Sequence, residues 1–305
     1  MYAVGSCKIA GIKTNERFAA LLCWGDEVNQ MKVYISADLE GATGVVHVDQ
    51  TNHERPVEYA FGCKMQLHDV NAVIEGLMDA GVEDVLVNDA HDRMINLDVS
   101  ALNQGVRLLS GTPKVMGMME GCGGADAVIF VAYHAMAGTP NAVLDHTVSG
   151  RRVYSVQLNG REVGETGLNA AVAAHYGIPV AMLTGDRAAC SEASALLGDG
   201  LVTACVKEAH GRFSAECLTP DESAKLLRAA AVEAVERVRA GTAPRMDVGD
   251  GSFDLRITFH TTLQCDRGAI LPGVERLGGR TLRVCGYGMA EMRRWSGALI
   301  GLGSD

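Results

Sequence analysis

The sequence predicts an α/β fold, in which a mixed, largely parallel sheet is flanked by helices and is followed by a smaller C-terminal α+β portion. Two observations lead to this fold class. From Met31 onward, short apolar runs alternate with longer stretches whose apolar residues recur at helical spacing. The chain has 305 residues, enough to bury one large core or two ordinary ones. Strands that alternate with helices in this way usually build a mainly parallel sheet.

The first half of the chain predicts four strands and one long helix. The helix is indicated by apolar residues that recur every three or four positions, and the strands by short apolar or alternating runs. Asn159-Gly160 follows the fourth strand and is typical of a tight hairpin turn. We expect the strands over residues 32–37, 85–87, 127–132 and 153–158, and the helix over residues 58–80.

The second half contains the best-marked helix, over residues 220–240. Thr219 is a natural N-cap, Pro220 suits the first helical position, and Glu222 completes a capping box. Gly241 ends this helix. The remaining predicted elements are helices over residues 163–176 and 186–197, strands over residues 179–183, 202–206, 252–260 and 281–286, and a final helix from about residue 288.

We divide the chain into three parts. Residues 1–30 differ from the rest and are predicted to be an N-terminal extension, either weakly ordered or preceding a natural start at Met31. Residues 31–242 are predicted to form the main α/β domain, and residues 243–305 a C-terminal subdomain. The apolar run within the extension is short for a signal peptide and lacks a suitable cleavage region.

The composition is typical of a folded globular protein and limits the classes of partner that the chain can bind. Apolar residues make up 48% and charged residues 21%, which excludes a disordered chain. The formal net charge of −10 argues against a protein that grips nucleic-acid phosphates over a broad surface. No apolar run approaches the roughly 20 residues that a membrane-spanning helix needs. We therefore expect a cytoplasmic protein without nucleic-acid or membrane partners.

The nine cysteines do not form a recognisable metal motif. None belongs to a Cys-x-x-Cys pair, so a thiolate zinc site is not expected. Their odd number and the size of the chain favour reduced thiols in a reducing compartment. The sequence also lacks a Gly-x-x-x-x-Gly-Lys phosphate loop and a Gly-x-Ser-x-Gly elbow, so we expect no nucleotide cofactor and no serine nucleophile.

Potential metal ligands follow three of the predicted strands. Asp38 and Glu40 come directly after the first strand, His91 follows the second, and His134 follows the third. Each motif alone is also typical of a strand that runs into a solvated turn, or of a hydrogen-bonded histidine. In open α/β sheets, however, ligands bind outside the carboxyl ends of the strands, where these four side chains can converge. Carboxylates together with imidazoles suit zinc or a similar first-row ion.

Two further polar residues can extend this group. Glu165 begins a predicted helix, where the helix dipole by itself also favours a glutamate. His146 lies in a polar loop and is either an exposed histidine or a general acid/base that Asp145 orients. The other six histidines lack such settings and are interpreted as surface or core residues: His47, His53, His68, His175, His210 and His260.

Four sequence motifs occur in the order and at the spacing of a known family. They are Ser36-x-Asp38-x-Glu40-Gly41, Val87-Asn88-Asp89-x-His91, Tyr133-His134-Ala135 and Val163-Gly164-Glu165-x-Gly167-Leu168-Asn169-Ala170. Together they resemble the bacterial zinc-dependent D-aminopeptidases of the dipeptide-transport operon type. The resemblance covers about Met31 to Gly241 and continues more loosely to the C-terminus.

The resemblance implies a site, a substrate class and an assembly. It implies catalysis by His146 and a shared site for two zinc ions, in which Asp38 is the bridging carboxylate. It further implies that short peptides such as D-alanyl-D-alanine lose their N-terminal D-amino acid, and that the chain forms a ring-stacked homo-oligomer, a decamer with active sites in its lumen. The implied metal ligands are Asp38, Glu40, His91, His134 and Glu165.

The resemblance also implies a mechanism, in which two metal ions activate a water that attacks the peptide carbonyl. His146 would stabilise the tetrahedral intermediate or carry a proton to the leaving amine. Asp89, two residues before His91, is expected to hold a ligand imidazole. Two alternatives stay open: a dinuclear metal hydrolase of another substrate class, such as a phosphoester or another amide, and a non-enzymatic small-molecule binding protein that kept the fold.

Overall fold

The structure, a computed structural model, describes residues 30–303. The predicted N-terminal extension lies outside the described residues, apart from its last residue. Within the described range, no helix is long and apolar enough to cross a membrane.

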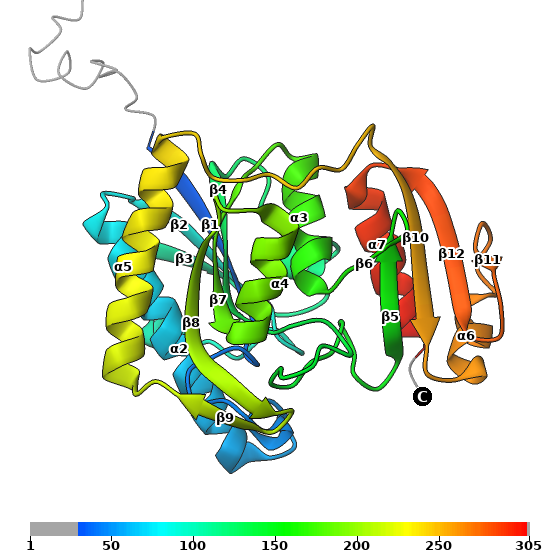
Figure 1. The fold of residues 1–305 in the computed structure, drawn as a ribbon, viewed down its shortest axis with the longest axis horizontal. Coiled ribbons are helices and arrows are strands. Elements are labelled where there is room, and N and C mark those ends of the chain that lie inside the picture. Colours follow the sequence, from blue (N-terminus) through cyan, green and yellow to red (C-terminus); the bar gives the residue numbers. More distant parts are fainter. Residues whose placement is uncertain (1–29, 304–305) are drawn as a thin grey trace, which may run out of the picture. The chain divides into compact units, whose positions relative to one another are not determined.

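The larger of two sheets has the strand order β3-β2-β1-β4-β7-β8-β9 (Figure 1). Every neighbouring pair in it is parallel except β8 and β9, which are antiparallel. The predicted mixed, largely parallel sheet is therefore confirmed. Its strands are β1 (Lys32–Ala37), β2 (Asp84–Asp89), β3 (Val106–Leu109), β4 (Ala127–Tyr133), β7 (Val180–Asp186), β8 (Val202–Gly211) and β9 (Ser214–Cys217).

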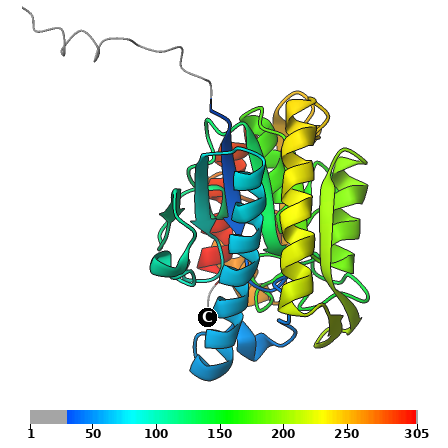
Figure 2. The ribbon, with the colours of Figure 1, turned by 90° about the vertical axis from the view of Figure 1, so that its left-hand side faces the viewer.

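Helices cover both faces of this sheet, as predicted. On one face, α2 (Pro56–Asp79) and α5 (Pro220–Arg239) lie side by side (Figure 2). On the other face lie α3 (Glu165–His175) and α4 (Arg187–Leu197). The strand β1 is buried on both sides because Val33 and Ile35 belong to the apolar cluster of the first face. Between them, Tyr34 belongs to the cluster of the second face, following the two-residue period of a strand.

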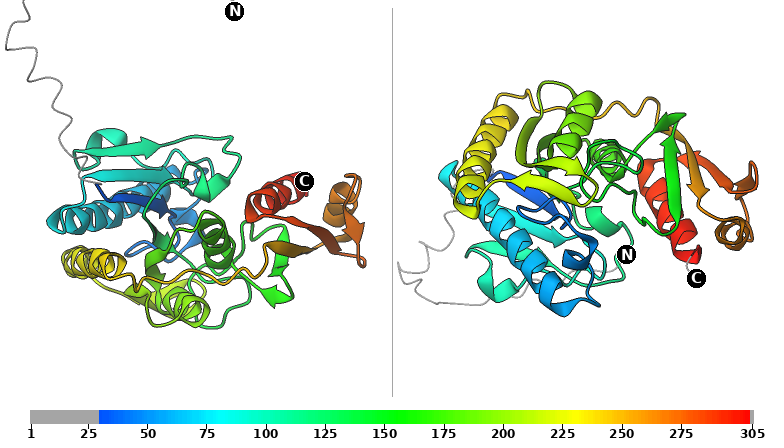
Figure 3. Two further views of the ribbon diagram at one scale, coloured as in Figure 1. Left: turned by 90° about the horizontal axis from the view of Figure 1, so that it is seen from above. Right: turned by 60° about the horizontal axis from the view of Figure 1, so that its bottom comes forward.

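The smaller sheet is antiparallel and has the order β11-β12-β10-β5-β6 (Figure 1). A helix at the C-terminus, α7 (Met289–Leu302), packs between this sheet and α3 (Figure 3). The hairpin predicted at Asn159-Gly160 is present, and both residues have the positive φ that such a turn requires. The elements not yet given are β5 (Val153–Leu158), β6 (Arg161–Glu162), β10 (Ser252–Phe259), α6 (Thr262–Gly268), β11 (Glu275–Arg276) and β12 (Thr281–Tyr287).

The smaller sheet draws its strands from both sides of the predicted boundary at residue 242. The strands β5 and β6 precede the boundary, whereas β10, β11 and β12 follow it. We therefore propose that the C-terminal subdomain, residues 243–305, is completed by the hairpin of residues 153–162, which the catalytic part of the chain supplies.

Several local features differ from the sequence prediction. Thr219 is the N-cap of α5 and Pro220 stands in the first turn, but the Thr219 side chain makes no capping hydrogen bond, so the predicted capping box is wrong. Short elements were not predicted, among them β3 and β9, which are four residues long, and α6, which is seven. Such short segments carry little periodic signal.

The topology brings the ends of three strands together. From β1 the chain continues outward to β2 and β3, and it then returns to β4 on the other side of β1. This reversal is a topological switch point, where open α/β sheets bind their ligands. Because β2, β1 and β4 are parallel neighbours, their carboxyl ends lie at one edge. The predicted ligands Asp38, His91 and His134 follow these three strands.

Candidate metal centre

Asp38 and Glu40 are held in a buried turn at the end of β1. Their exposed fractions are 3% and 5%. The backbone N–H of Asp38 donates to the Val131 carbonyl at 2.9 Å, and that of Gly41 donates to the Ala132 carbonyl at 2.8 Å. A Cβ at Gly41 would lie 2.0 Å from the Tyr133 carbonyl oxygen, so this close approach to β4 needs glycine.

His91 presents Nδ1 to these two carboxylates. Its Nε2 lies 2.9 Å from the Thr51 carbonyl oxygen, which can only accept, so the proton is on Nε2. Its Nδ1 then lies 3.1 Å from Oε2 of Glu40 and 3.4 Å from Oδ1 of Asp38. The orientation of a metal-binding imidazole is normally set in this way, by a partner on its other nitrogen.

Asp89 does not hold this imidazole, and that prediction is wrong. Both oxygens of the buried Asp89 accept hydrogen bonds from the backbone N–H of Asn96 and Leu97 and from the Asn96 side chain. The Asn96 side chain also donates to the His91 carbonyl at 2.8 Å. Asp89 therefore shapes the loop that carries His91, and the Thr51 carbonyl takes the role that the sequence suggested for it.

His134 is aimed at the same point by an irregularity in β4. The pairing of β4 with β7 shifts between Phe130 and Tyr133, and Ala132 within this stretch has a φ of 60°. Such a bulge redirects the side chains that follow. The Nδ1 of His134 donates to the Ala135 carbonyl at 3.0 Å. Its Nε2 lies 3.1 Å from Oε1 of Glu165 and 3.5 Å from Oδ2 of Asp38.

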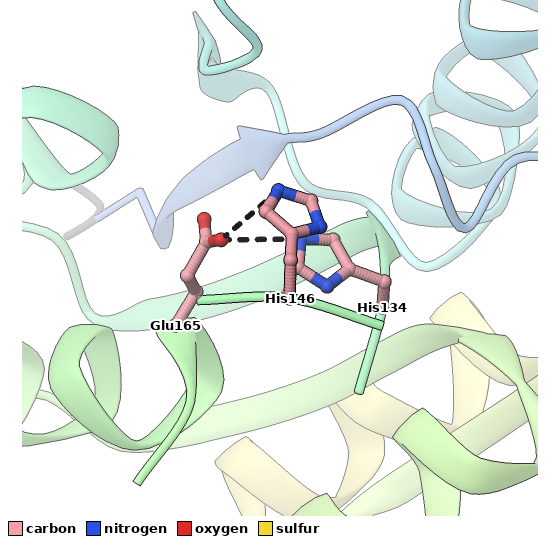
Figure 4. Close-up of side chains that lie close together, drawn as sticks. All are labelled: His134, His146 and Glu165. Atoms are coloured by element: carbon pink, nitrogen blue, oxygen red, sulfur yellow. Dashed lines mark ion pairs between the residues drawn. The ribbon is translucent and has the colours of Figure 1, made fainter. Parts of the chain in front are cut away.

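Glu165 is the first residue of α3 and turns its carboxylate toward two histidines, His134 and His146 (Figure 4). Its Oε1 also accepts a hydrogen bond from the Val148 N–H at 2.7 Å. The side chain is 8% exposed. Glu165 thus connects the cluster to the loop that carries His146.

His146 lies at the open side of the cluster. Its ring stacks on that of His134, with centroids 4.0 Å apart and planes 10° from parallel. Its Nδ1 donates to the Leu144 carbonyl at 2.8 Å, and its Nε2 lies 3.8 Å from Oε1 of Glu165. Among the described residues, the Asp145 carboxylate bonds not to this imidazole but to Arg212 and to the Gly138 N–H, from which it accepts. The expectation that Asp145 orients His146 directly is therefore wrong.

Burial and mutual charge shift the pKa values of the whole cluster. Burial, reinforced by repulsion from Glu40, raises the pKa of Asp38 to about 7. Burial opposes protonation of His91 and His134, yet the surrounding carboxylates hold the pKa of both well above its usual value. Burial likewise opposes ionisation of Glu165, but the charge of the nearby His134 lowers its pKa to about 2. The site therefore favours positive charge at its centre.

Three buried atoms in the cluster have no hydrogen-bond partner among the described residues: Asp38 Oδ2, Glu40 Oε2 and His134 Nε2. Buried polar atoms are nearly always satisfied, and a bound cation is a common explanation for exceptions. Carboxylate oxygens with imidazole nitrogens are the donors that zinc accepts. The donor set and its orphaned atoms therefore fit a metal ion.

Close contacts divide the cluster into two groups that share Asp38. Oδ1 of Asp38 faces His91, together with Glu40, whereas its Oδ2 faces His134, together with Glu165. The groups adjoin, because ligand atoms of Asp38, Glu40 and His134 all lie within 4.8 Å of one another. The ligand atoms of His134, His146 and Glu165 likewise all lie within 4.8 Å of one another.

A buried lysine supports the turn that carries Glu40. Lys207 in β8 is 1% exposed, and its ammonium donates to the carbonyls of Glu40 at 2.6 Å, Ala42 at 2.8 Å and Val45. Burial lowers the pKa of Lys207 to about 8, so the ammonium stays mostly charged at neutral pH. One side chain thus satisfies three carbonyls of the ligand turn.

Replacing Lys207 with methionine is expected to lower the free energy of unfolding by about 3 kcal/mol, because three buried carbonyls lose their donor. Urea denaturation measures the change. Lys225→Met is the matched control, since Lys225 is exposed and pairs with Glu222 on the same helix. A Lys207 variant as stable as this control would show that the three hydrogen bonds make no net contribution to the free energy of unfolding.

A cavity of about 670 Å³ opens beside His146. It lies between the loop after β4, the start of β5 and the β8–β9 turn, and it exceeds the volume of a dipeptide. His260, which was interpreted as a surface or core residue, borders this cavity. Its lining includes Met136, Asp145, His146, Tyr154, Arg212 and His260.

Sequence reasoning did not find four of the groups around the cluster. Lys207 carried a visible signal, because a charged residue interrupts the apolar run of a buried strand. Thr51 carried none, since it acts through its carbonyl. Arg212 and His260 reach the cavity through tertiary packing of the β8–β9 turn and of the smaller sheet.

Comparison with known proteins decides the family. The model of the D-aminopeptidase family matches residues 31–298 of this sequence. The chain belongs to the D-aminopeptidase family. This confirms the family and the enzyme class, an aminopeptidase, that the four motifs predicted. The alternative of a non-enzymatic binding protein is therefore wrong.

Two relatives of this D-aminopeptidase family member are informative. A D-aminopeptidase of Bacillus subtilis (strain 168) is 34% identical over 260 residues, which cover 82% of this chain and 89% of that protein. A solved structure is described as the Zn-dependent D-aminopeptidase DppA from Bacillus subtilis, a self-compartmentalizing protease. It matches with a TM-score of 0.84 and 31% identity, over 90% of this chain and 98% of that chain.

Proposed function

We propose that this D-aminopeptidase family member binds two zinc ions and removes N-terminal D-amino acids from short peptides such as D-alanyl-D-alanine. The observation that carries the proposal is the pair of ligand groups that share Asp38, each of which contains a buried ligand atom without a hydrogen-bond partner among the described residues. The Zn-dependence of the related solved structure supports the choice of metal. The proposed ligands are Asp38, Glu40, His91, His134 and Glu165.

When bound, the metal ions supply Lewis acidity and lower the pKa of water. The residues around them prepare the reaction. Because the Nδ1 of His146 donates to the Leu144 carbonyl, its Nε2 is left to accept a proton. Burial lowers the pKa of His146, which favours its neutral imidazole. His146 is then suited to take up a proton and transfer it to the leaving amine.

The surroundings of His146 are suited to a short peptide as the substrate. The cavity beside it has room for a dipeptide, and its wall carries both charged and aromatic groups. We further propose that the chain works as a homo-oligomer, a decamer as the family resemblance implies. The description of the related solved structure as a self-compartmentalizing protease supports assembly of this kind.

The proposal is tested by assaying purified protein on D-alanyl-D-alanine and L-alanyl-L-alanine, each with and without a chelator. We expect release of alanine from the D form only, loss of activity in the chelator, and recovery on adding zinc. Cleavage that resists the chelator would refute a metal mechanism. Cleavage of only the L form would refute the proposed stereoselectivity.

A further inference from the structure

His146 lies in a loop whose backbone is held in an unfavourable conformation. Two residues to either side, Leu144 and Val148 have φ values of 55° and 61°. Residues other than glycine rarely adopt this left-handed region, and a β-branched residue such as valine does so least. Strain of this kind persists only when neighbouring structure over-determines it. Contacts from outside the loop must therefore fix its shape.

Arg212 supplies such contacts from the turn between β8 and β9. Its Nη1 donates both to the carbonyl oxygen and to Oδ1 of Asp145. Its own carbonyl accepts a hydrogen bond from the Leu144 N–H at 3.0 Å. One residue of a different element thus holds the two residues that directly precede His146.

Asp145 extends this hold across the loop. Its Oδ2 accepts a hydrogen bond from the Gly138 N–H at 2.7 Å, so the carboxylate joins both arms of the loop. The side chain is 14% exposed, a setting in which charge-assisted hydrogen bonds are strong. His146 is tied in turn to Leu144, whose carbonyl accepts its Nδ1–H. The contacts form a chain from Arg212 to the imidazole.

The turn that carries Arg212 is itself anchored. The guanidinium lies over the ring of Phe213, 5.6 Å from its centroid, and Phe213 packs against His47 at 5.2 Å. The guanidinium and His146 both lie beside Gly150. A Cβ on Gly150 would lie 3.4 Å from Cβ of His146 and 4.0 Å from Nη2 of Arg212.

We propose that Arg212 is a positioning residue, which holds the loop of residues 136–150 so that the His146 imidazole stays stacked on His134 at the metal centre. This inference rests on the proposed function of His146. It assigns no contact between Arg212 and the peptide. Without the guanidinium, the strained loop relaxes and His146 leaves its place, while the metal ligands stay where they are.

The kinetic test is a double-mutant cycle of Arg212→Met and His146→Ala in the full-length protein, assayed with D-alanyl-D-alanine. In the wild-type background, Arg212→Met is expected to lower kcat about 10- to 100-fold, with KM and metal content unchanged. In the His146→Ala background it should cause no further loss. In Arg212→Lys the loss of kcat should be smaller, since the lysine ammonium replaces part of the interaction with Asp145.

Two kinetic outcomes would overturn the proposal. A rise in KM with unchanged kcat would mean that Arg212 binds the carboxylate of the peptide substrate. An equal loss of kcat with and without His146 would mean that Arg212 does not act through this histidine. Arg187→Met serves as the control, because Arg187 pairs with Glu208 on β8 outside the loop, and its kcat should match wild type.

Hydrogen exchange gives a readout that does not depend on activity. In Arg212→Met, peptides that cover residues 136–150 should exchange faster, whereas peptides from β1 and β4 should not change. Unchanged exchange of the loop would overturn the positioning role. If the wild-type enzyme fails to cleave D-alanyl-D-alanine, the proposed function fails, and the exchange experiment still decides the role of Arg212.

Discussion

Replacing Asp38 with asparagine is expected to abolish binding of both metal ions and to lower kcat/KM by about a thousandfold or more. Within the described part of the chain, Asp38 is the carboxylate that faces both ligand groups. Its Oδ1 lies 3.4 Å from Nδ1 of His91, and its Oδ2 lies 3.5 Å from Nε2 of His134. Asparagine keeps the shape of the side chain but removes the charge that the groups share. Metal analysis after dialysis measures the ions retained per chain.

Two companion variants make the result specific. Glu40→Gln should lose one ion and keep the other, because Glu40 pairs with His91, whereas Glu165 still serves the other group with His134. Asp98→Asn should keep both ions, since Asp98 is a surface carboxylate bonded to Ser100. An Asp38→Asn protein that retains two ions per chain would contradict the shared role.

The second large effect is expected for His146→Ala, which should lower kcat by about 10²- to 10⁴-fold while the metal content stays unchanged. The imidazole stacks on His134 and keeps Nε2 directed toward the cluster, but its removal leaves the proposed ligands in place. Steady-state kinetics and metal analysis on the same preparation separate the two effects.

His175→Ala is the matched control for this substitution, because His175 is an exposed histidine at the end of α3. Its kcat should equal that of wild type. Unchanged turnover in His146→Ala would remove His146 from the mechanism, whereas loss of metal in that variant would place it among the ligands instead.

The convergence of Asp38, His91 and His134 could be predicted from the sequence because it follows from strand order. Each residue directly follows an apolar strand, and parallel neighbouring strands end at one edge of a sheet. Glu165 and His146 were harder to place, since nothing in the residues alone shows that their segments return to this edge. Their assignment came from the motif resemblance.

The orientation of the site residues could not be predicted in the same way. The Thr51 carbonyl decides which nitrogen of His91 faces the cluster, and a shifted register in β4 aims His134. Both depend on backbone geometry that side-chain identity does not encode. The role assigned to Asp89 was wrong for this reason: it lies near His91 in sequence, but its oxygens are taken by backbone N–H groups of a nearby loop.

The place of β5 in the chain has a consequence for how the enzyme is made. β5 lies between the loop of His146 and the helix that begins at Glu165, yet it pairs with β10, and Asn159 bonds to Asp254, 95 residues later. At a ribosomal rate of about 5 to 20 residues per second, this strand waits about 5 to 20 s for its partner. The nascent chain can therefore pair β5 with β10, and place His260 at the cavity beside His146, only after residues 252–260 have been synthesised, although every proposed ligand precedes them in the sequence.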